Sequence, residues 1–152
     1  MLRIVEGNLD DARVVRLLET HIGQARAQTA EGSAHALDLD ALRDPQIRFW
    51  SIWKDEELLG VGALKRLARD HGEVKSMHTA QTVRGSGVAS FLMRHIIETA
   101  REERMAALSL ETGSWDYFAP ARAFYRKHGF TECPPFGDYR ADPNSAFFSL
   151  KL

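Results

Sequence analysis

A glycine-rich turn that leads directly into a helix is the part of the sequence with the clearest chemical potential. Residues 82–97 read TVRGSGVASFLMRHII, with helical spacing of apolar residues after the turn. The first N–H groups of a helix lack partners within it and carry the positive end of its dipole. Gly85 and Gly87 permit positive φ and leave the backbone open to an anion, and Arg84 can add a charge-assisted contact. We therefore predict a diphosphate site at this turn.

The turn does not fit the two commonest phosphate-binding patterns. A Walker loop requires Gly-Lys-Ser/Thr, which is absent here. A dinucleotide fingerprint requires a third glycine or alanine where Ser90 stands, and it belongs early in a βαβ unit, whereas a predicted antiparallel meander precedes this turn. Judged by itself, the turn could equally be an ordinary glycine-containing start of a helix that binds no ligand.

Other residues with reactive side chains offer weaker patterns. Cys133 is the only cysteine, so an internal disulfide and a four-cysteine zinc site are excluded, and no neighbouring base marks it as a nucleophile. His71 and His78 lack a His-Glu-x-x-His pattern, so we expect no metal. Arg140 and Asp142, in a polar loop, could bind a carboxylate or amine of a substrate, although such residues are usually only solvated.

Composition limits the class of protein. The chain has 152 residues, of which 44% are hydrophobic and 27% charged, as in an ordinary globular domain. A formal net charge of −1 gives no basic field for nucleic acid. No apolar run approaches the roughly eighteen residues of a membrane span, and MLRIVEGNLDDAR lacks a signal-peptide core. We predict a cytoplasmic protein with neither nucleic acid nor membrane as a partner.

Hydrophobic periodicity predicts alternating groups of strands and helices. The predicted strands are Leu2–Val5, Phe49–Trp53, Leu58–Leu64, Glu73–Thr79, Ala107–Thr112 and Ala146–Leu152. The predicted helices are one capped by Asn8 that carries Val14 to Ile22, a short one at Asp40–Arg43, one at Ser86–Arg101 with Val88, Phe91, Leu92 and Ile96 inward, and one at Pro120–His128. Thr29–His35 is predicted to be a loop. This order indicates an α+β or α/β sheet.

Three segments resemble the GNAT superfamily of N-acetyltransferases. The superfamily's acetyl-CoA signature, Gln/Arg-x-x-Gly-x-Gly/Ala, fits Arg84–Ala89 position by position. Gly72–Met77 is similar to its fourth-strand segment, often Ala-Glu-Ile-Lys-x-Met, and Ala121–Phe130 is similar to its helix ending in Tyr-x-x-x-Gly-Phe. Because order and gaps also agree, the resemblance covers nearly the whole chain as one N-acetyltransferase domain, residues 1–152, similar to a subgroup of small bacterial acetyltransferases.

The resemblance implies a three-layer α+β fold in which helices cover both faces of a mixed, mostly antiparallel sheet of six or seven strands. Strands four and five of this sheet splay apart, and acetyl-CoA, the implied co-substrate, lies in the opening. Main-chain groups of Met77, His78 and Thr79 are implied to contact the pantetheine arm. The residues implied to hold the diphosphate are Arg84, Gly85, Ser86, Gly87, Val88 and Ala89.

Acyl transfer to an amine requires a base for the ammonium proton, a donor for the oxyanion and an acid for the departing thiolate. Backbone N–H groups near Met77 and His78 could bind the oxyanion. The resemblance implies that Glu73 is the base, whereas without it Glu73 would be interpreted as a solvated charge at a strand start. Glu111, at the end of the next strand, is the reserve base, and water is a further alternative.

The resemblance implies that Tyr125 is the general acid. A tyrosine on a helix is more often a core aromatic, here beside Phe124, but the Tyr-x-x-x-Gly-Phe context favours the acid role. Phe118 and Ala121 precede Tyr125 by seven and four residues, so they share its helical face and are expected to line the acetyl channel.

The predicted activity is direct transfer of an acetyl group from acetyl-CoA to the primary amine of a small molecule in a ternary complex. The alternatives are an acetyltransferase that modifies a protein lysine or N-terminus, and a non-catalytic sensor that binds acyl-CoA. The acceptor is expected to lie between the first helices and the loop 134–145. Trp50, Trp53 and the apolar end strands could support a homodimer.

Overall fold

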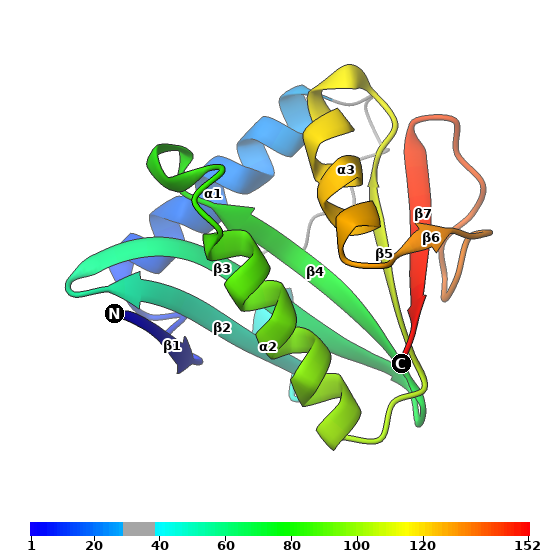
Figure 1. The fold of residues 1–152 in the computed structure, drawn as a ribbon. Helices are drawn as coiled ribbons and strands as arrows, with labels where there is room; N and C mark the ends of the chain where they lie inside the picture. Colours follow the sequence, from blue (N-terminus) through cyan, green and yellow to red (C-terminus); the bar gives the residue numbers. More distant parts are fainter. Residues whose placement is uncertain (29–38) are drawn as a thin grey trace.

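A seven-stranded sheet forms the middle layer of the molecule (Figure 1). The computed structural model describes residues 1–28 and 39–152, so the predicted loop Thr29–His35 lies outside the described residues. The strands are β1 (Leu2–Glu6), β2 (Ile47–Lys54), β3 (Glu57–Ala68), β4 (His71–Thr79), β5 (Ala107–Gly113), β6 (Thr131–Glu132) and β7 (Ser145–Lys151). Their order is β1-β2-β3-β4-β5-β7-β6, and only β4 and β5 pair in parallel. The predicted α+β sheet is confirmed, with β6 as a short strand that the sequence did not predict.

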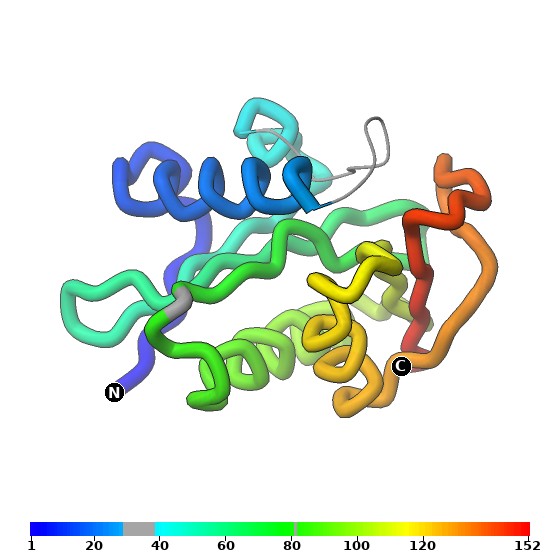
Figure 2. Tube along the Cα trace, turned by 90° about the horizontal axis from the view of Figure 1, so that it is seen from above, coloured from blue at the N-terminus to red at the C-terminus, as the bar shows by residue number. Residues whose placement is uncertain are grey.

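Helices cover both faces of the sheet. The α-helices are α1 (Ala12–Ala27), α2 (Val88–Glu102) and α3 (Ala119–Lys127), and three short 3-10 turns are η1 (Ala41–Arg43), η2 (Gln81–Val83) and η3 (Asp116–Phe118). Seen from above, α1 lies on one side of the sheet, and α2 and α3 lie on the other (Figure 2). Within residues 1–28 and 39–152, no helix combines the length and hydropathy of a membrane span. The expected three layers are therefore present.

Strand β2 contributes to a separate hydrophobic core on each face. Its side chains alternate, so Trp50 and Ile52 pack beneath α2, while Phe49 and Trp53 pack beneath α1. Trp50 and Trp53 are only 1% and 2% exposed. The expectation that these two tryptophans support a homodimer was therefore wrong, because neither reaches a surface that a second chain could cover, whereas the homodimer itself stays a prediction.

Two details of the helix predictions were wrong. Asp11, rather than Asn8, caps α1: its carboxylate accepts a hydrogen bond from the Arg13 N–H, while Asn8 has a φ of +74° in the preceding turn. Phe91 of α2 is 38% exposed instead of inward. Val88 and Leu92 are buried one turn apart, and Phe91 lies at the margin of their apolar stripe.

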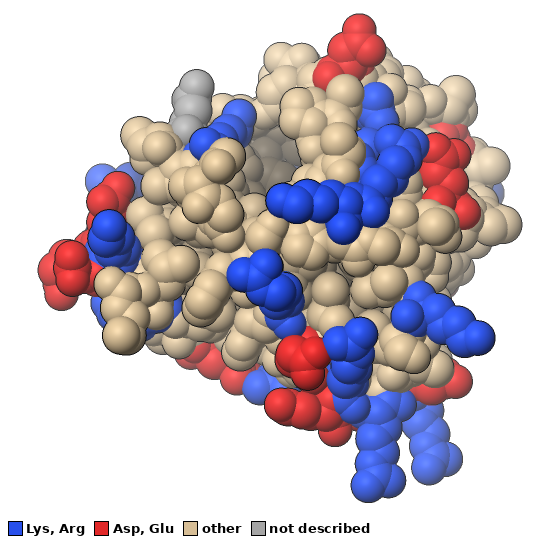
Figure 3. Space-filling view, in the orientation of Figure 1, with Lys and Arg blue, Asp and Glu red and all other residues tan. Residues whose placement is uncertain are grey.

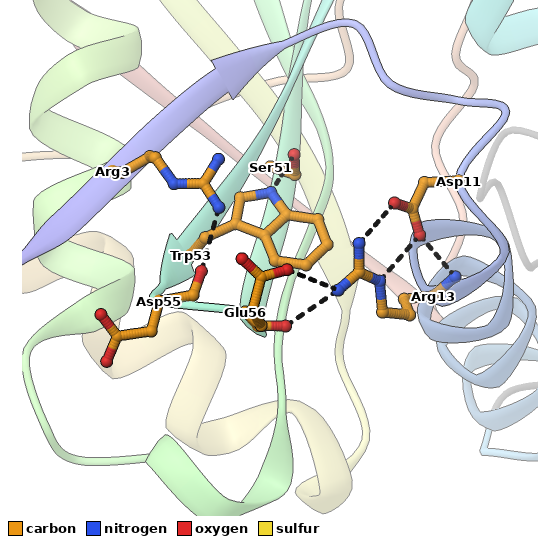
Figure 4. A network of polar contacts seen from close by, with 7 residues as sticks. All are labelled: Arg3, Asp11, Arg13, Ser51, Trp53, Asp55 and Glu56. Carbon is orange, nitrogen blue, oxygen red and sulfur yellow. Dashed lines mark hydrogen bonds and ion pairs between the residues drawn. The ribbon is translucent and has the colours of Figure 1, made fainter.

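A polar network ties the start of α1 to the turn between β2 and β3 (Figure 4). The Arg13 guanidinium is bonded to the Asp11 carboxylate at 2.8 Å and donates to the Glu56 carbonyl at 2.9 Å. It also lies 4.4 Å from the ring centroid of Trp53, and the Arg3 guanidinium lies 5.6 Å from the same ring. These contacts fix the position of α1, whose later turns form one wall of the cleft described below.

A β-bulge in β4 separates this strand from β5. Between the pairs Val61–His78 and Ala63–Lys75, a single residue of β3 faces both Ser76 and Met77, and Ser76 has a φ of +55°. A bulge bends its strand and leaves one residue without a ladder partner. The parallel pairing of β4 with β5 ends at Glu73 opposite Ser109, and the rest of β4 diverges. The implied splay of the fourth and fifth strands is confirmed.

Candidate active site

A cleft of about 380 Å³ opens where β4 and β5 diverge. It lies between α1 and α3 and extends to the turn before α2, and the space-filling view shows this face hollowed, with Lys and Arg side chains around the hollow (Figure 3). The residues that line it are His21, Ala25, Glu73, Val74, Lys75, Ser76, Met77, His78, Thr79, Arg84, Gly85, Ala89, Glu111, Thr112, Gly113, Tyr117, Phe118, Pro120, Ala121, Phe124, Tyr125 and Tyr139.

Most of the predicted site residues meet in this one cleft. Those that line it are Glu73, Met77, His78, Thr79, Arg84, Gly85, Ala89, Phe118, Ala121 and Tyr125, together with Glu111. Ser86, Gly87 and Val88 belong to the same turn but do not line the cleft. The Ser86 hydroxyl donates to the Val83 carbonyl, and the Val88 side chain is buried in the core beneath α2. Their part in ligand binding would therefore come from the backbone.

The turn before α2 presents its backbone to solvent. Gly85 has a φ of +79° and Gly87, the N-cap of α2, a φ of +90°. A Cβ built on either glycine would meet no atom within 4 Å. Arg84 beside them is exposed. An open turn at a helix N-terminus with a cation at its edge has the features expected of a diphosphate site.

Glu73 is buried at the inner end of the cleft. It is 3% exposed, and its Oε2 accepts hydrogen bonds from the Tyr139 hydroxyl at 2.6 Å and from the Lys75 ammonium at 3.2 Å. Lys75 Nζ also donates to the Tyr139 oxygen at 3.0 Å. Burial and the negative charge of Glu73 raise the pKa of the Tyr139 hydroxyl, which therefore stays a donor. Glu73, Lys75 and Tyr139 form a closed triad.

Glu111 lines the same cleft from β5. Burial is the main reason that the pKa of its carboxyl is raised to about 7, and the charges of Glu73 and Asp142 act in the same direction. The Ser145 hydroxyl donates to Glu111 Oε2 at 3.1 Å, and this bond and the charge of Lys75 oppose the rise in pKa. A carboxyl with a pKa near neutrality can accept and return protons at the pH of most cells.

Tyr125 contributes its ring to both the core and the cleft. The ring packs against Phe124, Phe130 and Phe148 at centroid distances of 5.6, 6.1 and 6.4 Å. Burial raises the pKa of its hydroxyl to about 12, with a smaller contribution from the negative charge of Glu111. The hydroxyl is thus protonated at neutral pH and available as a donor. The sequence left open whether Tyr125 is a core aromatic or a residue of the site. In the structure its ring packs in the core and also lines the cleft.

Two histidines stack at the α1 side of the cleft. The ring centroids of His21, on α1, and His78, on β4, are 4.7 Å apart. Desolvation lowers the pKa of each imidazole to about 4, and the charge of Arg84 adds to the effect at His78. Both rings are therefore neutral at pH 7 and form an uncharged wall on the way from the α2 turn to Glu73.

The cleft residues that sequence reasoning missed include Lys75, Tyr139 and His21. Lys75 had a usable signal, because residues two apart on a strand share a face and Lys75 follows Glu73 by two. Tyr139 lies 66 residues beyond Glu73, in a loop, and no local pattern points to their contact. His21 followed the apolar stripe of α1 and gave no sign that it would stack on His78.

The remaining candidates lie outside the cleft. His71 is bonded to the Ser109 hydroxyl at 2.7 Å, and Cys133 is half-buried, with the pKa of its thiol raised by desolvation. Neither residue lines the cleft. Arg140 and Asp142 line a neighbouring cavity instead. Across the described part of the chain, no group of three or more His, Cys, Asp or Glu side chains could hold a metal ion.

The cleft therefore combines an open helix N-terminus, of a kind that can bind phosphate groups, with an uncharged passage to two carboxyls and a tyrosine hydroxyl. This arrangement suits a long ligand with phosphates at one end and a reactive group at the other. The model of the acetyltransferase (GNAT) family matches residues 15–130 of the chain.

Known proteins resemble the chain over its whole length. It is 45% identical over 152 residues to YedL of Escherichia coli (strain K12), an uncharacterized N-acetyltransferase, and the match covers 100% of this chain and 96% of YedL. It is 37% identical to the IAA acetyltransferase of Azospirillum brasilense, over 97% of this chain and 95% of that protein. The crystal structure of a Bacillus subtilis acetyltransferase in complex with CoA has the same fold, with a TM-score of 0.73, 17% identity, and coverage of 100% of this chain and 99% of that one. The chain is thus a member of the GNAT family of N-acetyltransferases.

Proposed function

We propose that this N-acetyltransferase uses acetyl-CoA to acetylate the primary amine of a small molecule, by direct attack of the amine on the thioester. The observation that carries the proposal is the single cleft that joins the open turn Arg84–Ala89 to Glu73, Glu111 and Tyr125. The CoA in the Bacillus subtilis relative supports the co-substrate, and the name of the Azospirillum brasilense relative supports a small acceptor. A cytoplasmic location stays a prediction from composition.

Two carboxyls could accept the proton of the amine, and we assign this step to Glu111. Its raised pKa leaves it partly ionised at neutral pH, ready to take a proton from an attacking amine. Glu73, the base predicted from the sequence, already accepts hydrogen bonds from Lys75 and Tyr139 at one oxygen. In this proposal Glu73 holds the triad in place, and it remains the alternative base.

The other two steps fall to Tyr125 and to the bulge in β4. The protonated hydroxyl of Tyr125 donates its proton to the sulfur as the thiolate departs. Backbone N–H groups next to Ser76, at Met77 and His78, stabilise the oxyanion of the tetrahedral intermediate. No covalent intermediate on the enzyme is required.

The test of the proposal combines binding with turnover. Calorimetry with acetyl-CoA should give a heat of binding and a rise in Tm, because the ligand binds only the folded state. Release of the coenzyme A thiol should then depend on an added small amine. Binding without turnover across a broad panel of small amines and lysine peptides would point to an acyl-CoA sensor. Turnover with peptides alone would point to an enzyme that modifies proteins.

Gly87→Val is expected to weaken acetyl-CoA binding roughly tenfold or more, since a branched side chain blocks approach to the N–H groups that hold phosphates. Because Gly87 has a φ of +90°, valine also introduces backbone strain of about 1–2 kcal/mol. Titration calorimetry of the variant measures the loss of affinity.

Gly7→Val is the matched control for that strain. Gly7 has a φ of +83°, its Cβ position is equally open, and it does not line the cleft. Both variants should lower the Tm, but only Gly87→Val should weaken binding. Equal affinities in the two variants would show that the diphosphate does not lie at this turn.

A further inference from the structure

A second cavity, of about 920 Å³, adjoins the cleft. It lies between the end of β3, the start of β4 and the loop before β7. The residues that line it are Gln46, Lys65, Arg66, Leu67, Glu73, Lys75, Gly137, Asp138, Tyr139, Arg140, Ala141, Asp142 and Pro143. Glu73, Lys75 and Tyr139 also line the cleft, so the closed triad is a wall shared by both cavities. A molecule in the second cavity would therefore lie beside Glu73, the alternative base, at a wall that also borders the cleft of Glu111 and Tyr125.

Several charged groups of the second cavity already have partners. Lys75 is bonded to Glu73 and Tyr139. The Arg66 guanidinium donates to the Arg69 carbonyl at 2.6 Å and pairs with Glu103 at 3.4 Å. The Asp142 carboxylate accepts hydrogen bonds from the backbone and side-chain amides of Asn144. These groups shape the cavity and have less capacity to bind a ligand.

Two cations differ from this group. Among residues 1–28 and 39–152, neither the Lys65 ammonium nor the Arg140 guanidinium makes a hydrogen bond or ion pair. Lys65 is half-buried and stands directly opposite Glu73 in the β3–β4 ladder, so both side chains lie on the same face of the sheet. Arg140 approaches the cavity from the loop. A half-buried ammonium that forms no ion pair, even with the carboxylate opposite it, favours an anionic ligand.

The balance of charge limits which anion fits. The cavity is lined by four Lys or Arg side chains and three acidic ones, Glu73, Asp138 and Asp142. The slight excess of positive charge suits a carboxylate with a single charge, whereas a phosphate dianion would be repelled by the three nearby carboxylates. Because the proposed reaction acetylates an amine, the amino group would be at the other end of the same ligand, beside the wall shared with the cleft.

We propose that the acceptor is a small amine that also carries a carboxylate, and that Lys65 and Arg140 bind this carboxylate in the second cavity. Its amine then points past the shared wall toward the cleft. The inference rests on the proposed acetylation of a small amine and specifies the chemical class of that amine. Lys65 and Arg140 act in binding and take no part in the chemical step.

The experiment compares matched acceptors. Free amino acids, β-alanine and 4-aminobutyrate are each assayed with acetyl-CoA beside the corresponding amine without the carboxylate. For at least one pair, kcat/KM should be about tenfold or more higher with the carboxylate, as expected for a charge-assisted hydrogen bond. Equal kcat/KM within every pair, with turnover still observed, would overturn the inference but leave the proposed function intact. Absence of turnover with every amine would overturn both.

Variants then test the two cations. Lys65→Gln and Arg140→Gln should each raise the KM of the preferred carboxylate-bearing acceptor about tenfold, while kcat, the KM of acetyl-CoA and the rate with the matched amine stay close to wild type. Lys54→Gln, at the far end of β2, removes an exposed cation that lines neither cavity and should change nothing. Thermal melts identify any variant that fails to fold. If a variant impaired turnover equally with the carboxylate-bearing acceptor and with its matched amine, the assignment of Lys65 and Arg140 to carboxylate binding would be overturned.

Discussion

Glu111→Gln is expected to lower kcat/KM by about 10²–10⁴ and to abolish its rise between acidic and neutral pH. In the wild type, the base must be ionised to accept a proton. Because the pKa of Glu111 is raised to about 7, kcat/KM should increase as the pH rises through about 7 and then level off. Glutamine keeps the shape of the side chain but cannot titrate. The measurement is the initial rate of coenzyme A thiol release across this pH range.

Two companion variants identify which carboxyl is the base. Ser145→Ala removes a hydrogen bond that lowers the pKa of Glu111, so the rise in kcat/KM should move to higher pH. Glu73→Gln disturbs Lys75 and Tyr139 and should slow turnover, yet the rise near pH 7 should remain. If Glu73→Gln abolished the rise and Glu111→Gln kept it, Glu73 would be the base.

The same shift in pKa makes an independent prediction for stability. The pKa of Glu111 is higher in the folded chain than the ordinary value of about 4.5, so its protonated form is favoured by folding. The contribution of Glu111 to the free energy of unfolding is fully present below the pKa of the unfolded chain, and it is lost as the pH rises through about 7. Glu111→Gln should therefore raise the Tm relative to wild type above pH 7, even though it removes activity.

Tyr125→Phe is expected to lower kcat by about 10² or more while the affinity for acetyl-CoA stays unchanged. Only the hydroxyl is removed, and the ring can keep its packing against Phe124, Phe130 and Phe148. Single-turnover rates measure the chemical step, and calorimetry measures the affinity. Tyr117→Phe is the matched control, because Tyr117 lines the same cleft but is exposed and its hydroxyl contacts Gln24 of α1 at 3.3 Å. Wild-type turnover by Tyr125→Phe would mean that water protonates the thiolate.

The local patterns of the sequence were enough to predict the strands and helices, and the resemblance to the GNAT superfamily implied the opening between strands four and five. The glycine turn, the Glu73 strand and the Tyr125 helix each carry their signal within about ten residues, and the fold brings all three to one opening. The N-cap was misplaced because Asn8 and Asp11 are both good capping residues, and only the backbone distinguishes them. Phe91 was misplaced because helical spacing does not fix the edges of an apolar stripe.

The electrostatic features of the site depend on contacts between distant segments. The raised pKa of Glu111 results from burial among β5, β7 and the preceding loop, which no single segment encodes. Tyr139 reaches Glu73 only because its loop folds back over β7, where its ring packs 5.5 Å from Phe147. Glu111 and Ser145 are 34 positions apart and Glu73 and Tyr139 are 66 apart, so no periodic pattern in the sequence indicates that they meet. Only the folded structure reveals these contacts.

The wall of Glu73, Lys75 and Tyr139 also bears on how products leave. Coenzyme A would depart along the cleft toward the α2 turn, while the acetylated product would depart through the second cavity, beside Lys65 and Arg140. If the two proposals hold, neither product would obstruct the exit of the other. No fixed order of product release would then be imposed, and turnover would not have to wait for coenzyme A to leave first.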